Sequence, residues 1–117
     1  AIYHHGSTAR GDAAAESDLD IAVLLPHTLS PHKRFATRLE LIRAFEKAFP
    51  QFPLVDVTIL NDVPSLLFRY LVVTKGIRVY ERSCADAVQY ESLTMAEYFD
   101  FRPFLEQYRE QYVARHG

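Results

Sequence analysis

Several residue types that mark particular protein classes are scarce in this 117-residue chain. A single cysteine, Cys84, leaves no internal disulfide and no cysteine-based metal site, so a reducing cytoplasm is the expected compartment. No apolar run reaches the roughly 20 residues that a membrane span needs. The formal net charge of -2 also argues against a duplex DNA-binding protein, because such proteins carry a strong basic field.

The composition that is present indicates one ordinary globular domain. Hydrophobic residues make up 49% of the chain and charged residues 24%, which is close to the average for such domains. We expect residues 1–82 to form the core and residues 83–117 to form a helical extension that packs on this core, on a partner, or on both. The first motif begins after only five residues, so we also expect an N-terminal helix, which this chain does not include, to pack under the first strand.

The stretch from Gly6 to Asp20 organises the chain. Ile2 to His5 is predicted to be the end of a strand, and the Gly6-Ser7 pair that follows lets the backbone turn and approach a ligand closely. Asp18 and Asp20 then open a second strand of alternating pattern that runs to residue 25. The turn and the two acids share one end of a sheet only if these strands are antiparallel.

The next segments predict a crossover unit. Apolar residues recur at helical spacing from Phe35 to Phe49, and residues 54–60 form a strand rich in valine and isoleucine. A strand, a helix and a strand in succession place the two strands parallel, so Asp56 should lie beside Asp18 and Asp20. We therefore predict an α/β (α+β) fold in which helices flank a small mixed sheet.

The rest of the chain predicts two further helices around a short strand. Asn61 or Asp62 is expected to cap a helix that ends near Gly76, and residues 77–81 form the short strand. From Cys84 onward the pattern is helical, and Pro103 should break or kink the helix.

Three carboxylates at one sheet end are typical of a magnesium site. Asp18 and Asp20 lie two residues apart on one face of a strand, so both can reach cations about 3.5–4 Å apart. Asp56 would be a third ligand that also accepts a proton from an attacking hydroxyl. Without metal the three acids repel one another, which should raise their pKa values. A Gly6 amide and the Ser7 hydroxyl could donate to a triphosphate, and Arg10 could steady one of its phosphates.

These residues resemble a known signature. Gly6-Ser7, followed after ten residues by Asp18-Leu19-Asp20 and later by Asp56, resembles the DNA polymerase beta-like nucleotidyltransferase superfamily. The strings Gly-Ser-Thr-Ala-Arg-Gly and Ser-Asp-Leu-Asp-Ile are similar to prokaryotic minimal nucleotidyltransferases, in particular the MntA antitoxins that pair with HepT toxins of the HEPN ribonuclease class. The resemblance covers most of residues 1–112. His5 departs from it, since relatives often carry an aromatic residue there, and we expect His4 and His5 to pack rather than to bind metal.

The resemblance implies a function and a set of site residues. It implies transfer of AMP from ATP, with two magnesium ions, to a tyrosine hydroxyl of a cognate HEPN toxin in a hetero-oligomer, without membrane or direct nucleic-acid binding. The catalytic and metal-binding residues would be Asp18, Asp20 and Asp56. The nucleotide would be bound by Gly6, Ser7, Arg10 and Ser17.

The aromatic tail leaves alternatives open. Tyr108, Tyr112 and their aromatic neighbours either cover the core of this domain or anchor a partner. An antitoxin that inhibits its toxin only by covering it is one alternative function. A nucleotidyltransferase that acts on an antibiotic or metabolite with a separate subunit is another.

Overall fold

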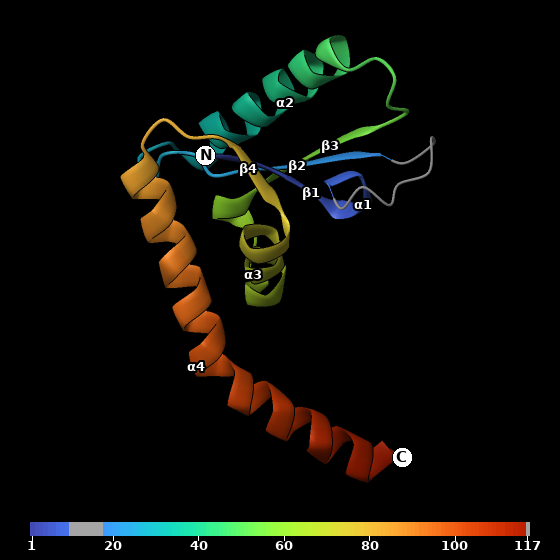
Figure 1. Cartoon of the computed structure of the whole chain (residues 1–117), viewed down its shortest axis with the longest axis vertical. Coiled ribbons are helices and arrows are strands. Elements are labelled where there is room, and N and C mark those ends of the chain that lie inside the picture. The colour runs from blue at the N-terminus through green and yellow to red at the C-terminus, as the bar shows by residue number, and fades with distance from the viewer. Residues whose placement is uncertain (10–17, 117) are drawn as a thin grey trace.

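The computed structural model describes residues 1–9 and 18–116 (Figure 1). Its elements follow in the order β1 (Ile2–His5), α1 (Gly6–Ala9), β2 (Leu19–Val23), α2 (Pro31–Ala48), β3 (Val55–Ile59), the 3-10 turn η1 (Leu60–Asp62), α3 (Leu66–Lys75), β4 (Ile77–Tyr80) and α4 (Cys84–His116).

The four strands form one mixed sheet in the order β3-β2-β1-β4. Strand β1 runs antiparallel to both β2 and β4, whereas β2 and β3 are parallel. The parallel direction predicted for β2 and β3 is therefore confirmed, and the antiparallel arrangement that the site requires of β1 and β2 is present. The end of β1 and the starts of β2 and β3 meet at one end of the sheet, and this is the end that carries Gly6 and the acids.

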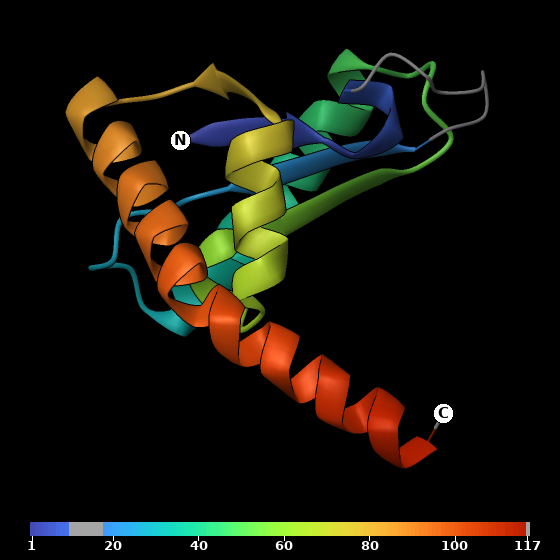
Figure 2. The same ribbon diagram turned by 60° about the horizontal axis from the view of Figure 1, so that its bottom comes forward.

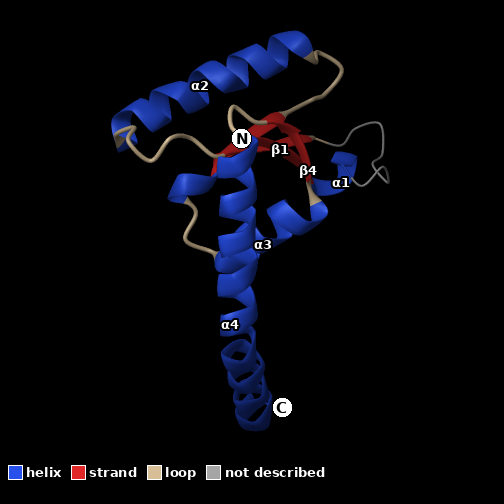
Figure 3. Cartoon of the chain, turned by 60° about the vertical axis from the view of Figure 1, so that its left-hand side comes forward, coloured by secondary structure: helices blue, strands red, loops and turns tan. Residues whose placement is uncertain are grey.

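Helix α2 covers β2 and β3 on one face of the sheet, and α3 and α4 lie on the other face (Figure 3). The core under α2 consists of the odd-numbered residues of the two strands, and Leu41, Ile42 and Phe45 of the helix pack against it. Arg38 of α2 also reaches the edge strand, where its Nε donates a hydrogen bond of 2.7 Å to the Val57 carbonyl. The inner face of the helix therefore agrees with the predicted apolar stripe at Ile42 and Phe45, whereas Phe35 and Leu39 of that stripe are exposed.

The opposite face carries a second, smaller core. Tyr3, Ala22, Leu60 and Val72 are buried together there. The Tyr3 hydroxyl donates to Glu91 of α4 at 2.7 Å, and Arg78 of β4 binds the same carboxylate at 3.0 Å. Burial and the Glu91 carboxylate both raise the pKa of Tyr3, so this hydroxyl stays protonated and ties α4 to the sheet.

Asn61 and Asp62, which were predicted to cap α3, instead bind residues that are distant in the sequence. Asn61 binds the backbone of Leu25 through both its amide nitrogen and its amide oxygen, each at 2.9 Å. Asp62 pairs with Arg34 at 2.7 Å. The cap of α3 is instead Ser65, whose hydroxyl accepts from the Phe68 amide. The predicted cap was therefore wrong.

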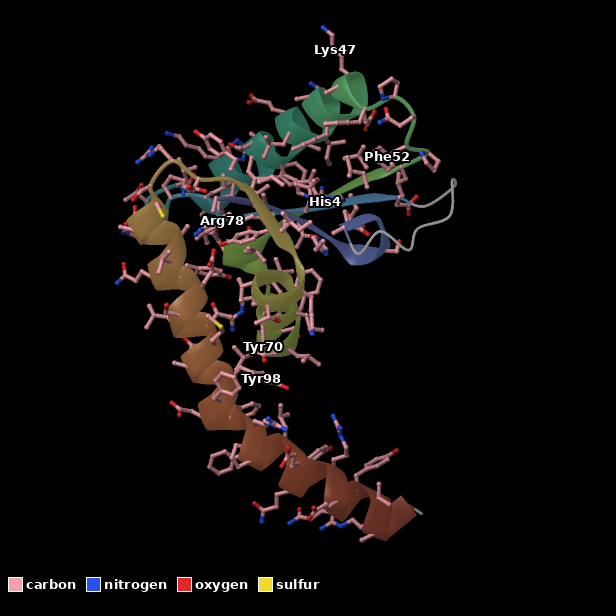
Figure 4. The ribbon with its side chains drawn as sticks, in the orientation of Figure 1. His4, Lys47, Phe52, Tyr70, Arg78 and Tyr98 are labelled. Atoms are coloured by element: carbon pink, nitrogen blue, oxygen red, sulfur yellow. The ribbon has the colours of Figure 1, made fainter. Side chains whose placement is uncertain are left out.

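Helix α4 extends well beyond the sheet (Figures 1 and 2). Its 33 residues correspond to about 50 Å of helix. Pro103 lies inside the helix, which continues through it without a break, and the change of direction about halfway along the helix agrees with the alternative prediction of a kink. In the half that packs on the domain, Tyr98 stacks on Tyr70 of α3 with ring centroids 3.8 Å apart (Figure 4). No helix in the described ranges combines the length and the apolar character that a membrane span requires.

Candidate active site

Gly6 forms the turn between β1 and the short helix α1. Its φ of 79° lies in the left-handed region, which side chains with a Cβ rarely adopt. A Cβ at this position would also collide with the Oδ2 atom of Asp20. The backbone at Gly6 therefore passes directly against the carboxylate, and the half-buried Ser7 follows in the first turn of α1.

The acids meet at the same end of the sheet. Asp20 of β2 is in register with Asp56 of β3, and neighbouring strands lie about 4.8 Å apart. Asp18 lies one residue before β2 and so continues the alternation that places Asp20 on this face. Asp20 is half-buried, whereas Asp18 and Asp56 are exposed. The structure thus places the three acids, Gly6 and Ser7 at one end of the sheet, with Gly6, Asp20 and Asp56 as direct neighbours. The predicted residues Arg10 and Ser17 lie outside the described residues.

His5 adds a group that was predicted only to pack. It is in register with Asp20, so His5, Asp20 and Asp56 form a row across β1, β2 and β3. Its ring packs edge-on against Phe68 at 5.6 Å, which agrees with the packing prediction. Its Nε2 is buried and has no hydrogen-bond partner within the described ranges. The pairing register of β1 and β2 is the only signal for its place beside Asp20.

Burial and neighbouring charges shift the pKa values of two members of this row. Burial raises the pKa of Asp20 first, the carboxylates of Asp56 and Asp18 raise it further, and His5 opposes them. The predicted repulsion between acids therefore contributes at Asp20, although burial is the larger cause. Burial also lowers the pKa of His5, with Asp20 and Asp56 acting in the opposite direction. The row thus combines an uncharged imidazole with a carboxylate that a cation would stabilise.

The donor set fits a magnesium ion that protein and substrate hold jointly. Within residues 1–9 and 18–116, no three histidine, cysteine or acidic side chains converge closely enough to enclose a metal ion. Magnesium, however, usually takes one or two protein carboxylates and completes its shell with water and substrate phosphates. Asp20 and Asp56, with Asp18 beside them, provide such a partial set of hard oxygen ligands.

His5→Phe should make stability less sensitive to acid. Because the folded-state pKa of His5 is lowered, the unfolded chain binds the extra proton more readily, and stability is lost as the pH falls through about 6.5, the unfolded value. Phenylalanine cannot take up this proton and still packs edge-on against Phe68. The decrease in melting temperature from pH 7.5 to pH 5.5 should therefore be smaller for the variant than for the wild type. An equal fall in both proteins would contradict this effect of His5.

Two comparisons with known proteins agree with this geometry. The family model described as polymerase beta, nucleotidyltransferase matches residues 1–85. A crystal structure of a toxin-antitoxin with AMP-PNP is 26% identical, with a TM-score of 0.74, and the match covers 96% of this chain and 84% of that chain. No curated protein gives a significant match.

Two further solved structures share the fold at lower identity. A toxin-antitoxin MntA-HepT structure is 24% identical, with a TM-score of 0.66. A tri-AMPylated Shewanella oneidensis HEPN toxin in complex with MNT antitoxin is also 24% identical, with a TM-score of 0.67. Each match covers 96% of this chain and 81% of the other. The family model spans more than half of the chain and includes Gly6, Asp20 and Asp56, and the chain therefore belongs to the polymerase beta nucleotidyltransferase family.

Proposed function

We propose that this protein is an antitoxin that transfers AMP from ATP to a tyrosine hydroxyl of a HEPN-type ribonuclease toxin and thereby neutralises it. The observation that carries the chemistry is the register of Asp20 with Asp56 beside the Gly6 turn. The choice of a toxin as acceptor is supported by the solved relatives, which include a toxin-antitoxin with AMP-PNP and an AMPylated HEPN toxin bound to its MNT antitoxin.

The residues of the site would divide the reaction between them. The Gly6-Ser7 turn would donate hydrogen bonds to the triphosphate, with Arg10 and Ser17 assisting. Asp18, Asp20 and Asp56 would hold magnesium, which neutralises the charge of the triphosphate. Asp56 would also accept the proton of the tyrosine hydroxyl. The hydroxyl oxygen bonds to the α-phosphorus, the bond to the bridging oxygen breaks, and pyrophosphate leaves with that electron pair.

Mass spectrometry tests this proposal directly. The protein is mixed with ATP, magnesium and the cognate toxin, and the toxin should gain one or more AMP units on tyrosine. Asp56→Ala should leave the toxin unmodified. A toxin that is inactive but unmodified in a tight complex would indicate inhibition by binding. AMP transfer only to a small molecule would indicate the metabolite-modifying alternative.

The second half of α4 supports a contact with the partner. In this proposal residues 1–82 carry the chemistry and residues 83–117 extend to the toxin. The face of α4 that packs on the domain includes the buried Ala87 and Thr94, and helical spacing continues this face through Phe101 and Tyr108. These two side chains are 46% and 69% exposed. Large exposed aromatic residues are typical anchors of protein interfaces.

Replacing these anchors should weaken the complex without unfolding the domain. The double variant Phe101→Ser and Tyr108→Ser is expected to weaken toxin binding by about 30-fold, the loss typical of two interface anchors. Isothermal titration calorimetry measures the affinity, and circular dichroism checks the fold. Val88→Ser is the control, because Val88 is 46% exposed on the half of α4 that packs on the domain. A lower melting temperature with unchanged affinity would show that the tail stabilises the domain instead.

A further inference from the structure

A polar cavity lies at the end of the sheet opposite the acids. It has a volume of about 360 Å³, and its lining comes from the segments that follow β2 and β3 and from α2, α3 and α4. Leu24, one of its lining residues, follows Asp20 by four residues on the same face, which corresponds to about 13 Å of strand. The buried side chains of Tyr3, Ala22 and Val72 pack on this face, so the cavity is not an extension of the candidate active site.

Hydrogen bonds of two side chains, Asn61 and Arg34, hold the segments that surround this cavity. Asn61 holds the backbone of Leu25 through two hydrogen bonds of 2.9 Å. Arg34 binds Asp62 through Nε and Nη2, at distances down to 2.7 Å, and its Nη1 donates to the Leu29 carbonyl at 2.7 Å. The charge of Arg34 is therefore balanced by Asp62, and the loop after β2 is tied to η1 and α2. Hydrogen bonds therefore hold the segments around the cavity in place.

Arg69 and Tyr90 line the cavity with unused hydrogen-bonding capacity. The Nε of Arg69 is buried and has no hydrogen-bond partner within the described residues. The buried hydroxyl oxygen of Tyr90 forms no hydrogen bond of good geometry there, although the side chains of Thr94 and Arg69 lie close enough to lower its pKa. Arg69 also forms no ion pair in this part of the chain. Buried polar groups without partners are rare in native proteins, and one explanation for them is a bound ligand.

The charges around the cavity favour an anion. Arg69 and the exposed His27 line it without a paired carboxylate, since Asp62 is committed to Arg34. Burial raises the pKa of the Tyr90 hydroxyl, the side chains of Thr94 and Arg69 oppose this shift, and Glu97 adds a smaller contribution that raises the pKa. The hydroxyl therefore stays protonated at neutral pH and is available as a donor. A guanidinium and a hydroxyl donor together suit the oxygens of a phosphate group.

We propose that this cavity is a binding site for a small phosphate-bearing anion, held by Arg69 and the Tyr90 hydroxyl with His27 at the entrance. The volume lies within the range of natural small-molecule pockets and exceeds that of a single phosphate ion. The site has room for either inorganic phosphate or a phosphomonoester such as AMP. It is separate from the transfer site, so the inference does not depend on the function proposed above.

Chemical shifts of backbone amides in the whole chain test the site. The protein is titrated with sodium phosphate, and separately with AMP, against sodium chloride of equal ionic strength. The backbone amides of Leu24, Leu25 and His27 and of residues 60–63 should shift, and Arg69→Gln should weaken this response at least tenfold. Arg43→Gln on the exposed side of α2 is the matched control and should change nothing. His27→Ala, at an exposed loop position, should weaken the response about threefold and guards against a folding defect in the Arg69 variant.

Each result is decisive for the proposal. A response to phosphate alone identifies a free-anion site, and a stronger response to AMP identifies a phosphomonoester site. The proposal is overturned if neither probe shifts these amides, if shifts appear only near Gly6 and Asp20, or if Arg69→Gln responds like the wild type.

Discussion

Asp20→Asn is expected to reduce AMP transfer by on the order of 10³-fold while the fold stays intact. Asparagine keeps the shape of the side chain but removes the negative charge that would hold a cation beside the triphosphate. Asp20 is the member of the row that lies against the Gly6 backbone and in register with Asp56. Its loss should therefore affect the chemical step more than toxin binding. Single-turnover transfer to the toxin, measured at saturating toxin, separates the two.

The same variant should also change the pH dependence of the melting temperature in a direction that the pKa of Asp20 determines. The folded-state pKa of Asp20 is raised, so its ionised form destabilises the fold at a pH above that value. Asp20→Asn should accordingly melt at or above the wild-type temperature at pH 8, and the difference should shrink as the pH falls toward 4. Glu40→Gln, an exposed position of α2, is the control and should leave transfer unchanged. Unfolding of Asp20→Asn would mean that the carboxylate is structural, and retained transfer would exclude it from the site.

Gly6→Ala should damage both stability and activity. Alanine at a φ of 79° adds about 1–2 kcal/mol of backbone strain, and the collision of its Cβ with Asp20 adds about 1–3 kcal/mol. We expect the melting temperature to fall by about 10 °C or more. Transfer should fall at least about 100-fold, because the displaced carboxylate no longer occupies its place beside Asp56. Differential scanning calorimetry and the same transfer assay measure the two effects.

A double-mutant cycle identifies the cause of that damage. If the collision with the Asp20 carboxylate matters, Asp20→Ala should relieve part of the destabilisation caused by Gly6→Ala, whereas backbone strain at Gly6 would persist. Ser7→Ala is the neighbouring control, since it changes a side chain without either effect. Strict additivity of the two substitutions would show that strain alone is responsible.

The topology of the site could be predicted from the sequence because simple rules determine it. Alternation in β2 placed Asp18 and Asp20 on one face, and the crossover through α2 made β2 and β3 parallel. The exact pairing of Asp20 with Asp56, and of His5 with Asp20, depends on strand register. Register follows from packing between distant segments, which the pattern of a single strand does not contain.

Other features could not be predicted because tertiary contacts override local preferences. Phe35 and Leu39 fit the same apolar helix stripe as Phe45, yet only Phe45 of these three packs on the sheet. Asn61 suits a helix cap by its chemistry, but it binds the backbone of a loop 36 residues away in the sequence. The same amide and carboxylate groups can form helix-cap hydrogen bonds or hydrogen bonds to distant segments, so only the folded structure shows which of the two a residue forms.

The hydrogen bond from Arg38 to the Val57 carbonyl affects the open edge of the sheet. Strand β3 lies at the edge of the sheet, and an open edge invites another chain to add as a further strand. The Arg38 guanidinium occupies a carbonyl that such a strand would need, and it brings a positive charge to that edge. The strand that carries Asp56 therefore offers one acceptor fewer to an added strand.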